Sequence, residues 1–201
     1  MFCIEYAAAN ITVHITIPTQ SDPVPLKSVF GWIIIHQRLG YTFDWNLIWA
    51  HYKGGFGSID ADFWLGLQKL HLLTSSQPYR LRVEVQERST NLWYSAEYWS
   101  FKIRDGNNVN KYRLEVSGYS GDAGDSLQYE GDGGIFNHIK FTAIDQDNDN
   151  LGGDNCASSR GGAWWYNACS WACLTCHYDH YEWHSMGFRF VVNSRMMIKL
   201  Q

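Results

Sequence analysis

The sequence contains no long apolar run, no long basic run and no heptad or Gly-X-Y repeat. A membrane-spanning helix needs roughly 18 or more apolar residues in a row, so we expect no membrane span. The chain carries 16 Lys and Arg against 20 Asp and Glu, a formal net charge of −4. Without a basic patch it is poorly suited to a phosphate backbone, which argues against nucleic acid as a partner. Without a stalk sequence, we expect oligomerisation only through segments that are not in this chain.

Signatures of enzymes are also missing. We find no ordered Ser, His and Asp set, no catalytic carboxylate pair and no glycine-rich phosphate loop set between a strand and a helix. The sequence therefore predicts a protein without catalytic activity. The N-terminal segment lacks the basic start of a signal peptide and is interrupted by Glu5 and Asn10, so any export signal is expected upstream.

Aromatic residues are abundant, with 10 Trp, 12 Tyr and 10 Phe among 201 residues. This is more aromatic surface than a core of this size needs, and aromatic side chains are typical of recognition surfaces. We therefore expect some of them to be exposed. A hydrophobic content of 45% over this length can form a sizeable core, and one domain is predicted.

Antiparallel strands are predicted where apolar and polar residues alternate and turn residues follow. The pattern occurs in residues 79–87, 92–103 and 111–119. A β-branched run predicts a buried strand over 31–38, and residues 188–200 are expected to form a terminal strand that closes the sheet.

Two short amphipathic helices are predicted by large apolar residues at helical spacing. They cover residues 43–57, ended by a Gly-Gly pair, and residues 60–76. The segment after Gly118 has too little periodicity for either element and is expected to be loop. Long loops inside a compact domain are usually functional or held by ligands.

An acidic loop precedes a tryptophan-rich loop bounded by cysteines within residues 141–169. Asp145, Asp147 and Asp149 alternate, and the Leu-Gly-Gly at 151–153 follows with carbonyl groups that a flexible turn can direct at a cation. Such oxygen ligands suit calcium and do not suit zinc or copper. A solvated acidic turn without metal is the alternative.

The acidic loop does not match an EF-hand. That loop requires Gly at position 6 and Glu at position 12, and counting from Asp145 these positions hold Asn150 and Cys156. No flanking amphipathic helices are predicted beside it either.

The five cysteines form an odd set, so at least one cannot pair within the chain. Cys156 and Cys169 bound a plausible disulfide loop, which would contribute about 3 kcal/mol of stability in the chain-entropy model. Cys173 and Cys176 lie in the sequence WACLTC, just before His177. This cluster allows three interpretations: a local disulfide, a CxxC redox pair or part of a zinc site.

Six stretches of the sequence, which follow one another in the same order as in the family, resemble the fibrinogen C-terminal globular domain. This family includes fibrinogen chains, ficolins, angiopoietins, tenascins and many invertebrate lectins. The matching stretches are GWIIIHQR, YKGGFGSIDADFWLGLQKLHLLTS, YRLRVEV, KYRLEVSGYSGDAGDSL, DQDNDN and NCASSRGGAWWYNAC. The resemblance implies an α+β fold over residues 31–201, with a twisted antiparallel sheet, short helices and a loop-rich calcium-binding subdomain. Residues 1–30 would be a divergent N-terminal lead.

The resemblance also implies a calcium ion. Its ligands would be the side chains of Asp147 and Asp149 and the backbone carbonyls of Leu151 and Gly153, with water completing the shell. Asp145 would lie just outside. Two carboxylates imply a dissociation constant on the order of 10⁻⁴ to 10⁻³ M, as in extracellular modules.

By the same resemblance, Cys156 and Cys169 form a disulfide. The ligand pocket of the family lies beside it and depends on a cis peptide, which here would be Ala168–Cys169. A Tyr, an Asn and a His line that pocket in the members that bind acetyl groups, and the corresponding residues are Arg160, Ala168 and Ser170. None of the three is retained.

Trp165 and Tyr178 complete the candidate ligand-binding set, which therefore comprises Arg160, Trp165, Ala168, Ser170 and Tyr178. The tryptophan pair at 164–165 could instead pack beneath the loop. Beyond it, CLTC replaces the Asn-Leu-Asn-Gly of the family, and part of the loop that forms the other pocket wall is missing.

These features predict a secreted, calcium-dependent recognition module that binds a glycan or an acetylated group as lectins do. The alternative is an extracellular protein interaction module without sugar binding, which the loss of the pocket residues favours. An oxidoreductase that uses Cys173 and Cys176 is a third interpretation and rests on their spacing alone.

Overall fold

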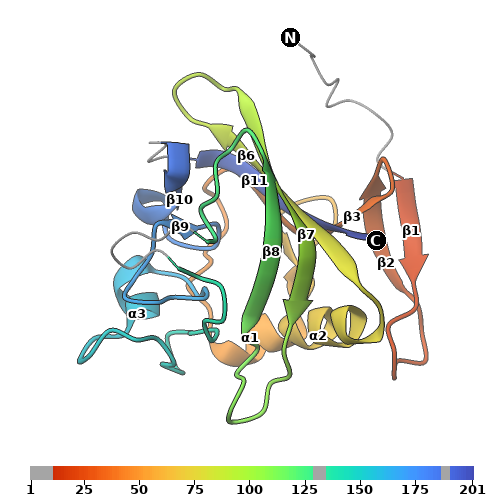
Figure 1. Cartoon of the computed structure of the whole chain (residues 1–201), viewed down its shortest axis with the longest axis horizontal. Helices are drawn as coiled ribbons and strands as arrows, with labels where there is room; N and C mark the ends of the chain where they lie inside the picture. The colour runs from red at the N-terminus through yellow and green to blue at the C-terminus, as the bar shows by residue number, and fades with distance from the viewer. Residues whose placement is uncertain (1–10, 129–134, 187–190) are drawn as a thin grey trace.

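The computed structural model describes residues 11–128, 135–186 and 191–201 (Figure 1). In spatial order, the main strands are β1 (Ile11–Ile15), β2 (Val24–Val29), β3 (Trp32–Leu39), β11 (Val191–Leu200), β6 (Tyr79–Glu87), β7 (Trp93–Ile103) and β8 (Leu114–Gly121). Neighbours along this path are antiparallel. Two short strands, β4 (Phe56–Gly57) and β5 (Phe63–Trp64), join the sheet where β5 pairs with β3. The predicted α+β fold with an antiparallel sheet is confirmed.

The predicted strands agree with the structure. The alternating segment 79–87 is β6, and β7, β3 and β11 lie within or beside the predicted ranges. β8 begins later than predicted because Lys111 and Tyr112 have positive φ angles of 45° and 53°, which interrupt an extended chain. Residues 188–190 of the predicted terminal strand lie outside the described residues.

The N-terminal hairpin of β1 and β2 extends the same sheet. Phe30 and Gly31 have positive φ angles of 50° and 77° and connect β2 to β3 in a tight turn, with Val29 opposite Trp32. The boundary predicted at residue 30 falls inside this turn. Residues 1–10 of the predicted lead lie outside the described part of the chain.

The two predicted helices are present but shorter than predicted. α1 covers Trp49–Gly54 and α2 covers Leu67–Ser76. The carboxylate of Asp145 accepts the backbone N–H of Trp49 at 2.7 Å and so begins α1 from a distant part of the chain. α2 starts only after Gly66, whose φ of 108° ends the short strand β5. In Figure 1, both helices cover the same end of the sheet, where α2 packs against β7 and α1.

A loop-rich region packs beside the sheet and helices. It contains α3 (Cys156–Arg160), the short pair β9 (Ala172–Cys173) and β10 (Glu182–Trp183), and the single turns η1 (Tyr178–His180) and η2 (His184–Met186). One hydrophobic core runs from the helices into this region, so its loops rest on buried apolar side chains. None of the helices within the described residues is long and apolar enough to cross a membrane.

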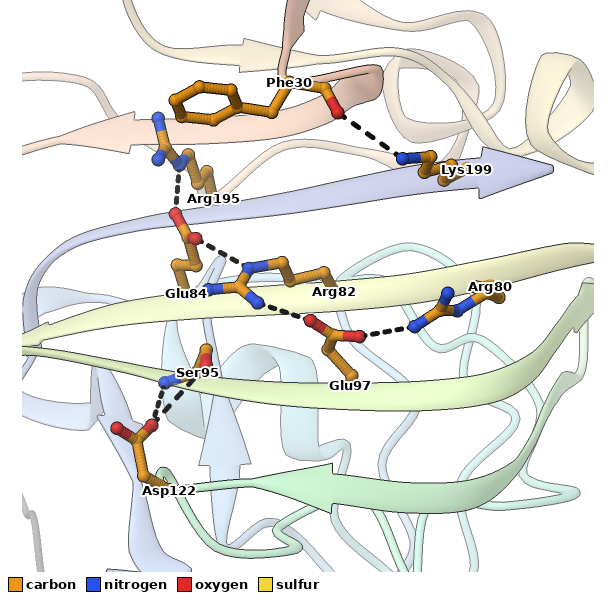
Figure 2. A network of polar contacts seen from close by, with 9 residues as sticks. All are labelled: Phe30, Arg80, Arg82, Glu84, Ser95, Glu97, Asp122, Arg195 and Lys199. Atoms are coloured by element: carbon orange, nitrogen blue, oxygen red, sulfur yellow. Dashed lines mark hydrogen bonds and ion pairs between the residues drawn. The ribbon is translucent and has the colours of Figure 1, made fainter. Parts of the chain in front are cut away.

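A network of charged side chains lies on the other face of β6, β7 and β11 (Figure 2). Arg82 donates to Glu84 at 2.7 Å and also pairs with Glu97, and Arg80 pairs with Glu97 at 2.7 Å. Arg195 on β11 pairs with the second oxygen of Glu84. Because the charges alternate across neighbouring strands, the network joins three strands that a core on one face alone would hold less firmly.

Candidate functional site

The acidic loop is ordered by its own backbone. Asp147 accepts the N–H of Asp149 at 3.1 Å, and Asp149 accepts the N–H of Leu151 at 2.9 Å through Oδ1. The other oxygen of Asp149 accepts the N–H of Cys156 at 2.8 Å. Each carboxylate is therefore held in a defined direction by main-chain donors, while its oxygens keep a further lone pair for a ligand.

The loop concentrates negative charge. Partial burial raises the pKa of Asp149, and the nearby charge of Asp147 raises it further. Among the described residues, no Lys, Arg or His lies within 4.0 Å of either carboxylate. Two close carboxylates without a positive partner repel one another, so a bound cation would relieve this repulsion.

The candidate ligands for such a cation are all oxygen atoms, from carboxylates and backbone carbonyls. The described residues contain no cluster of three or more His, Cys, Asp and Glu, so an ion at Asp147 and Asp149 would depend on backbone carbonyls for further ligands. Leu151 is half-buried and Gly153 is exposed with a φ of 97°, and the role of their carbonyls as ligands stays a prediction. This donor set fits calcium and lacks the sulfur and nitrogen ligands of a zinc site. Asp145 is used elsewhere, since its Oδ1 accepts the N–H of Trp49 at 2.7 Å, and its place just outside the set stays a prediction.

Two further contacts join the acidic loop to the loop between the cysteines. The N–H of Asn150 donates to the carbonyl of Asn167 at 2.7 Å, and their side chains are hydrogen bonded at 2.8 Å. With the bond from Cys156 to Asp149, the acidic loop is attached near both ends of the tryptophan-rich loop. The two loops are therefore held together by hydrogen bonds at both places.

The tryptophan-rich loop is closed by the disulfide Cys156–Cys169, with a Cα–Cα distance of 5.2 Å. It begins with α3, whose N-cap Asn155 accepts the N–H of Ala157 at 2.8 Å. The described peptide bonds are all trans, including Ala168–Cys169, and Cys169 instead has a φ of 58°. The cis peptide of the family pocket is therefore not found in this structure.

Cys173 and Cys176 form a second disulfide, with an S–S distance of 2.00 Å. Both are fully buried, and the hydroxyl of Tyr166 lies 2.8 Å from the sulfur of Cys176. Of the three interpretations of this cluster, the structure contains the local disulfide, which leaves no thiolate for zinc. Cys3 lies outside the described residues.

The aromatic run of the loop forms core rather than surface. Trp164, Trp165 and Tyr166 are completely buried. The indole of Trp165 donates to the carbonyl of Tyr112 at 2.8 Å, and its ring meets Phe141 edge to face at 5.0 Å. Trp165 was included in the candidate ligand-binding set, but here its side chain supports the loop from beneath.

The other candidate ligand-binding residues are distributed over different surroundings. Arg160 is half-buried, with Nη1 2.8 Å from Nδ1 of His180, and Ala168 is exposed. The hydroxyl of Ser170 is buried and has no hydrogen-bond partner among the described residues. Tyr178 is 47% exposed and lines a cleft of about 420 Å³ that also contains Arg38 and Tyr41. None of the first three lines that cleft, and sequence reasoning missed its other residues.

Gly162 tests how tightly the tryptophan-rich loop packs against the loop between Cys173 and Cys176. A Cβ atom on Gly162 would lie 1.9 Å from the carbonyl oxygen of Thr175, so Gly162→Ala must displace backbone. We expect a loss of about 1–3 kcal/mol in the free energy of unfolding, measured by urea denaturation. Gly152→Ala is the matched control, because its Cβ would meet nothing within 4 Å. Equal stability of the two variants would contradict the close packing.

Comparison with known proteins gives consistent matches. Residues 27–192 match the family model described as the C-terminal globular domain of fibrinogen beta and gamma chains. Human angiopoietin-related protein 7 is 45% identical over 141 residues, which is 70% of this chain and 38% of that protein. Fibrinogen-like protein A of Apostichopus parvimensis is 38% identical over 155 residues, covering 76% of this chain and 51% of that protein. This chain thus spans about half or less of these relatives.

Solved structures agree with the sequence matches. The fibrinogen-like globe domain of human ANGPTL2 superimposes with a TM-score of 0.81 at 28% identity, covering 97% of this chain and 94% of that one. The corresponding domain of human ANGPTL6 gives a TM-score of 0.83, also at 28% identity, over 98% and 91% of the two chains. The likeness therefore extends over the loop-rich region as well as the sheet.

Proposed function

This chain belongs to the family of fibrinogen C-terminal globular domains, and on that premise we propose that it is a secreted, non-enzymatic recognition domain whose binding region is held in shape by calcium. The observation that carries the proposal is the position of Asp149. Its carboxylate, a candidate calcium ligand, also accepts the N–H of Cys156, where the disulfide loop begins. An ion at this position would stabilise the disulfide loop through a single side chain.

In this proposal, Asp147 and Asp149 hold the ion through their side chains, and Leu151 and Gly153 through their carbonyls. The ion supplies positive charge where two carboxylates repel each other and one of them is partly buried. Because calcium binds the folded loop and not the unfolded chain, it stabilises the fold by mass action. It has no part in bond making or breaking.

Calcium is therefore expected to raise the melting temperature. With a dissociation constant on the order of 10⁻⁴ to 10⁻³ M, about 10 mM calcium would add about 1.4 to 2.7 kcal/mol. For a domain of this size, this corresponds to an increase of about 3–10 °C over the same protein in EDTA, measured by calorimetry. Asp149→Asn should lose this increase, whereas Asp154→Asn, on the exposed part of the same loop, should keep it. Equal melting temperatures with calcium and EDTA would refute the site.

The proposed ligand is a glycan or an acetylated group, bound as lectins bind theirs. Support comes from the hydrogen bonds between Asn150 and Asn167, which join the acidic loop to the exposed segment at Ala168, beside the disulfide. Beads that carry N-acetylated sugars should retain the protein in calcium and release it in EDTA. Retention that is absent under both conditions, or that EDTA leaves unchanged, would contradict a calcium-dependent lectin.

A second candidate function is the recognition of an extracellular protein. It is favoured because Arg160, Ala168 and Ser170 do not reproduce the acetyl-binding set and Trp165 is buried. Relatives such as angiopoietin-related protein 7 and human tenascin-R, which is 36% identical over 160 residues, are consistent with it. Capture of one extracellular protein that excess N-acetylated sugar does not displace would select this function over the first.

A further inference from the structure

A cleft of about 420 Å³ lies between residues 41–46 and residues 176–178. Its size is within the roughly 300–1,000 Å³ range of small-molecule sites. Among the described residues, its lining includes no residue of the acidic loop and only Tyr178 of the candidate ligand-binding set. Gly161 also lines it, so the cleft adjoins the tryptophan-rich loop but does not include Ala168 or Ser170.

Arg38 is the central feature of this cleft. It lines the cleft although it is only 2% exposed. Nη1 donates to the carbonyls of Cys176 at 2.5 Å and Leu174 at 3.4 Å, and Nε donates to that of Gly40 at 3.2 Å. These acceptors are all neutral. Among the described residues, no carboxylate lies within 4.0 Å of the guanidinium and Nη2 has no hydrogen-bond partner.

A buried guanidinium without a directly bonded carboxylate is unfavourable, and the surroundings of Arg38 reflect this. Burial lowers its pKa, and two neighbours offset this only in part: Tyr181, whose ring lies 4.0 Å from the Cζ atom of Arg38, and the buried carboxylate of Asp62. His36 on the same strand adds no charge, because burial and the charge of Arg38 lower its pKa to about 3. An anionic ligand group in the cleft would supply the hydrogen-bonded negative partner that Arg38 lacks among the described residues.

Aromatic rings form the rim of the cleft. Tyr41 is 39% exposed and Tyr178 is 47% exposed, and their ring centroids lie 6.2 Å apart. His177 packs on Tyr178 with a centroid distance of 4.2 Å, which restricts the tyrosine ring. The hydroxyl of Tyr41 donates to the carbonyl of Val191 at 2.9 Å, which fixes its ring. Flat aromatic rings at a cleft mouth provide apolar faces for a ring-shaped ligand.

We propose that this cleft binds an acidic saccharide, with a carboxylate or sulfate group accepting hydrogen bonds from Arg38 and a sugar ring lying against Tyr178 and Tyr41. The inference rests on the lectin-like proposed function and gives it a ligand class and a position. A neutral sugar would leave Arg38 without an anionic hydrogen-bond partner, and a free inorganic anion would leave the tyrosine rings without a partner.

Substitution of Asp44 can test whether the ligand of the cleft carries negative charge. It is exposed in the lining of the cleft, and its Oδ1 accepts the N–H of Asn46 at 2.9 Å. A carboxylate at this position repels an anionic ligand, whereas an asparagine can keep the turn and lose the charge. Asp44→Asn should therefore strengthen binding of an acidic saccharide about twofold, the effect of a unit charge about 10 Å away in water. Binding of a neutral sugar should not change.

The test measures binding of the whole chain, kept in calcium, to four probes by surface plasmon resonance. They are trigalacturonic acid, its uncharged counterpart galactotriose, a heparin-derived tetrasaccharide and triacetylchitotriose, so that carboxylate, sulfate and acetyl chemistry are separated. We expect at least one acidic probe to bind about tenfold tighter than galactotriose, and Tyr178→Ala to lose about tenfold, or 1.4 kcal/mol. Trp99→Ala, 58% exposed and outside the cleft lining, is the control and should bind as wild type.

The outcomes separate this inference from the function on which it rests. If neither acidic probe binds tighter than galactotriose, or if Tyr178→Ala keeps wild-type affinity for the acidic probes, the cleft is overturned. Binding of triacetylchitotriose alone, with loss in EDTA, would also overturn the cleft but leave the lectin function in place. Binding of none of the four saccharides would reject both and favour protein recognition. Because these variants lie at the surface, the test does not depend on replacing the buried Arg38.

Discussion

Replacing Trp165 with alanine is expected to lower the free energy of unfolding by about 3–5 kcal/mol, the range for a large aromatic residue removed from a packed core. Its side chain is completely buried and touches the ring of the adjacent Trp164 and rings from two other parts of the chain. Their centroid distances are 5.0 Å to Phe141, 5.0 Å to Trp164 and 6.3 Å to Trp64. Because the ring lies between the helix layer and the disulfide loop, its removal leaves a cavity that neither side can fill easily.

Urea denaturation measures this loss, with two controls. Trp165→Phe keeps much of the ring but leaves the carbonyl of Tyr112 without its donor, and it should fall between wild type and alanine. Trp99→Ala should cost about 1 kcal/mol or less, since Trp99 is 58% exposed and its main contact is with Arg80 at 5.0 Å. If Trp165→Ala were no more destabilising than Trp99→Ala, the buried position of Trp165 would be wrong.

Replacing Glu84 with alanine is expected to cost about 3 kcal/mol or more. Glu84 is 4% exposed and lies between Arg82 and Arg195, each paired with one of its oxygens (Figure 2). Burial alone would lower the pKa of Arg82, but its bonds to Glu84 and Glu97 more than offset this and the pKa is raised. Removal of the shared carboxylate leaves the guanidinium groups of Arg82 and Arg195 to repel each other, although Arg82 keeps its pair with Glu97, and breaking one side of a buried ion-pair network is strongly destabilising.

The matched control for Glu84 is Asp60→Asn. The pair of Lys27 and Asp60 has a distance of 2.6 Å, but the Asp60 side chain is 76% exposed. Pairs in water contribute about 0–1 kcal/mol, so this variant should remain close to wild type in urea denaturation. Similar losses for the two variants would mean that the network on the sheet contributes no more than a surface ion pair.

The strands could be predicted from sequence because alternation is a local property of an extended chain. The helix boundaries could not. Trp45 has helical spacing with Trp49, yet α1 begins only at Trp49, where the carboxylate of Asp145 caps it. A cap that lies 96 residues away leaves no signal in the local pattern. In the same way, composition cannot show that Trp164 and Trp165 face inward, because the residues that cover them come from distant elements.

The candidate site could be predicted in part. Asp147 and Asp149 stand out by their spacing, and their role as calcium ligands stays a prediction that the melting experiment tests. Arg38 was missed. The stretch GWIIIHQR contained a signal, because this strongly apolar strand ends in the charged residue Arg38. A charge at the end of a buried strand needs a polar partner or a ligand. The sequence could not show that Tyr178 lines the same cleft as Arg38, because the two residues are far apart in the chain and only the fold brings them together.

The position of β11 between β3 and β6 determines the order in which the sheet can be assembled. As the ribosome releases the chain from its N-terminus, β1 to β3 and β6 to β8 emerge early, yet they cannot join each other until residues 191–200 arrive. Until then each half presents an open edge, a state prone to pairing with other chains. We therefore expect the sheet to close only after translation has passed this strand.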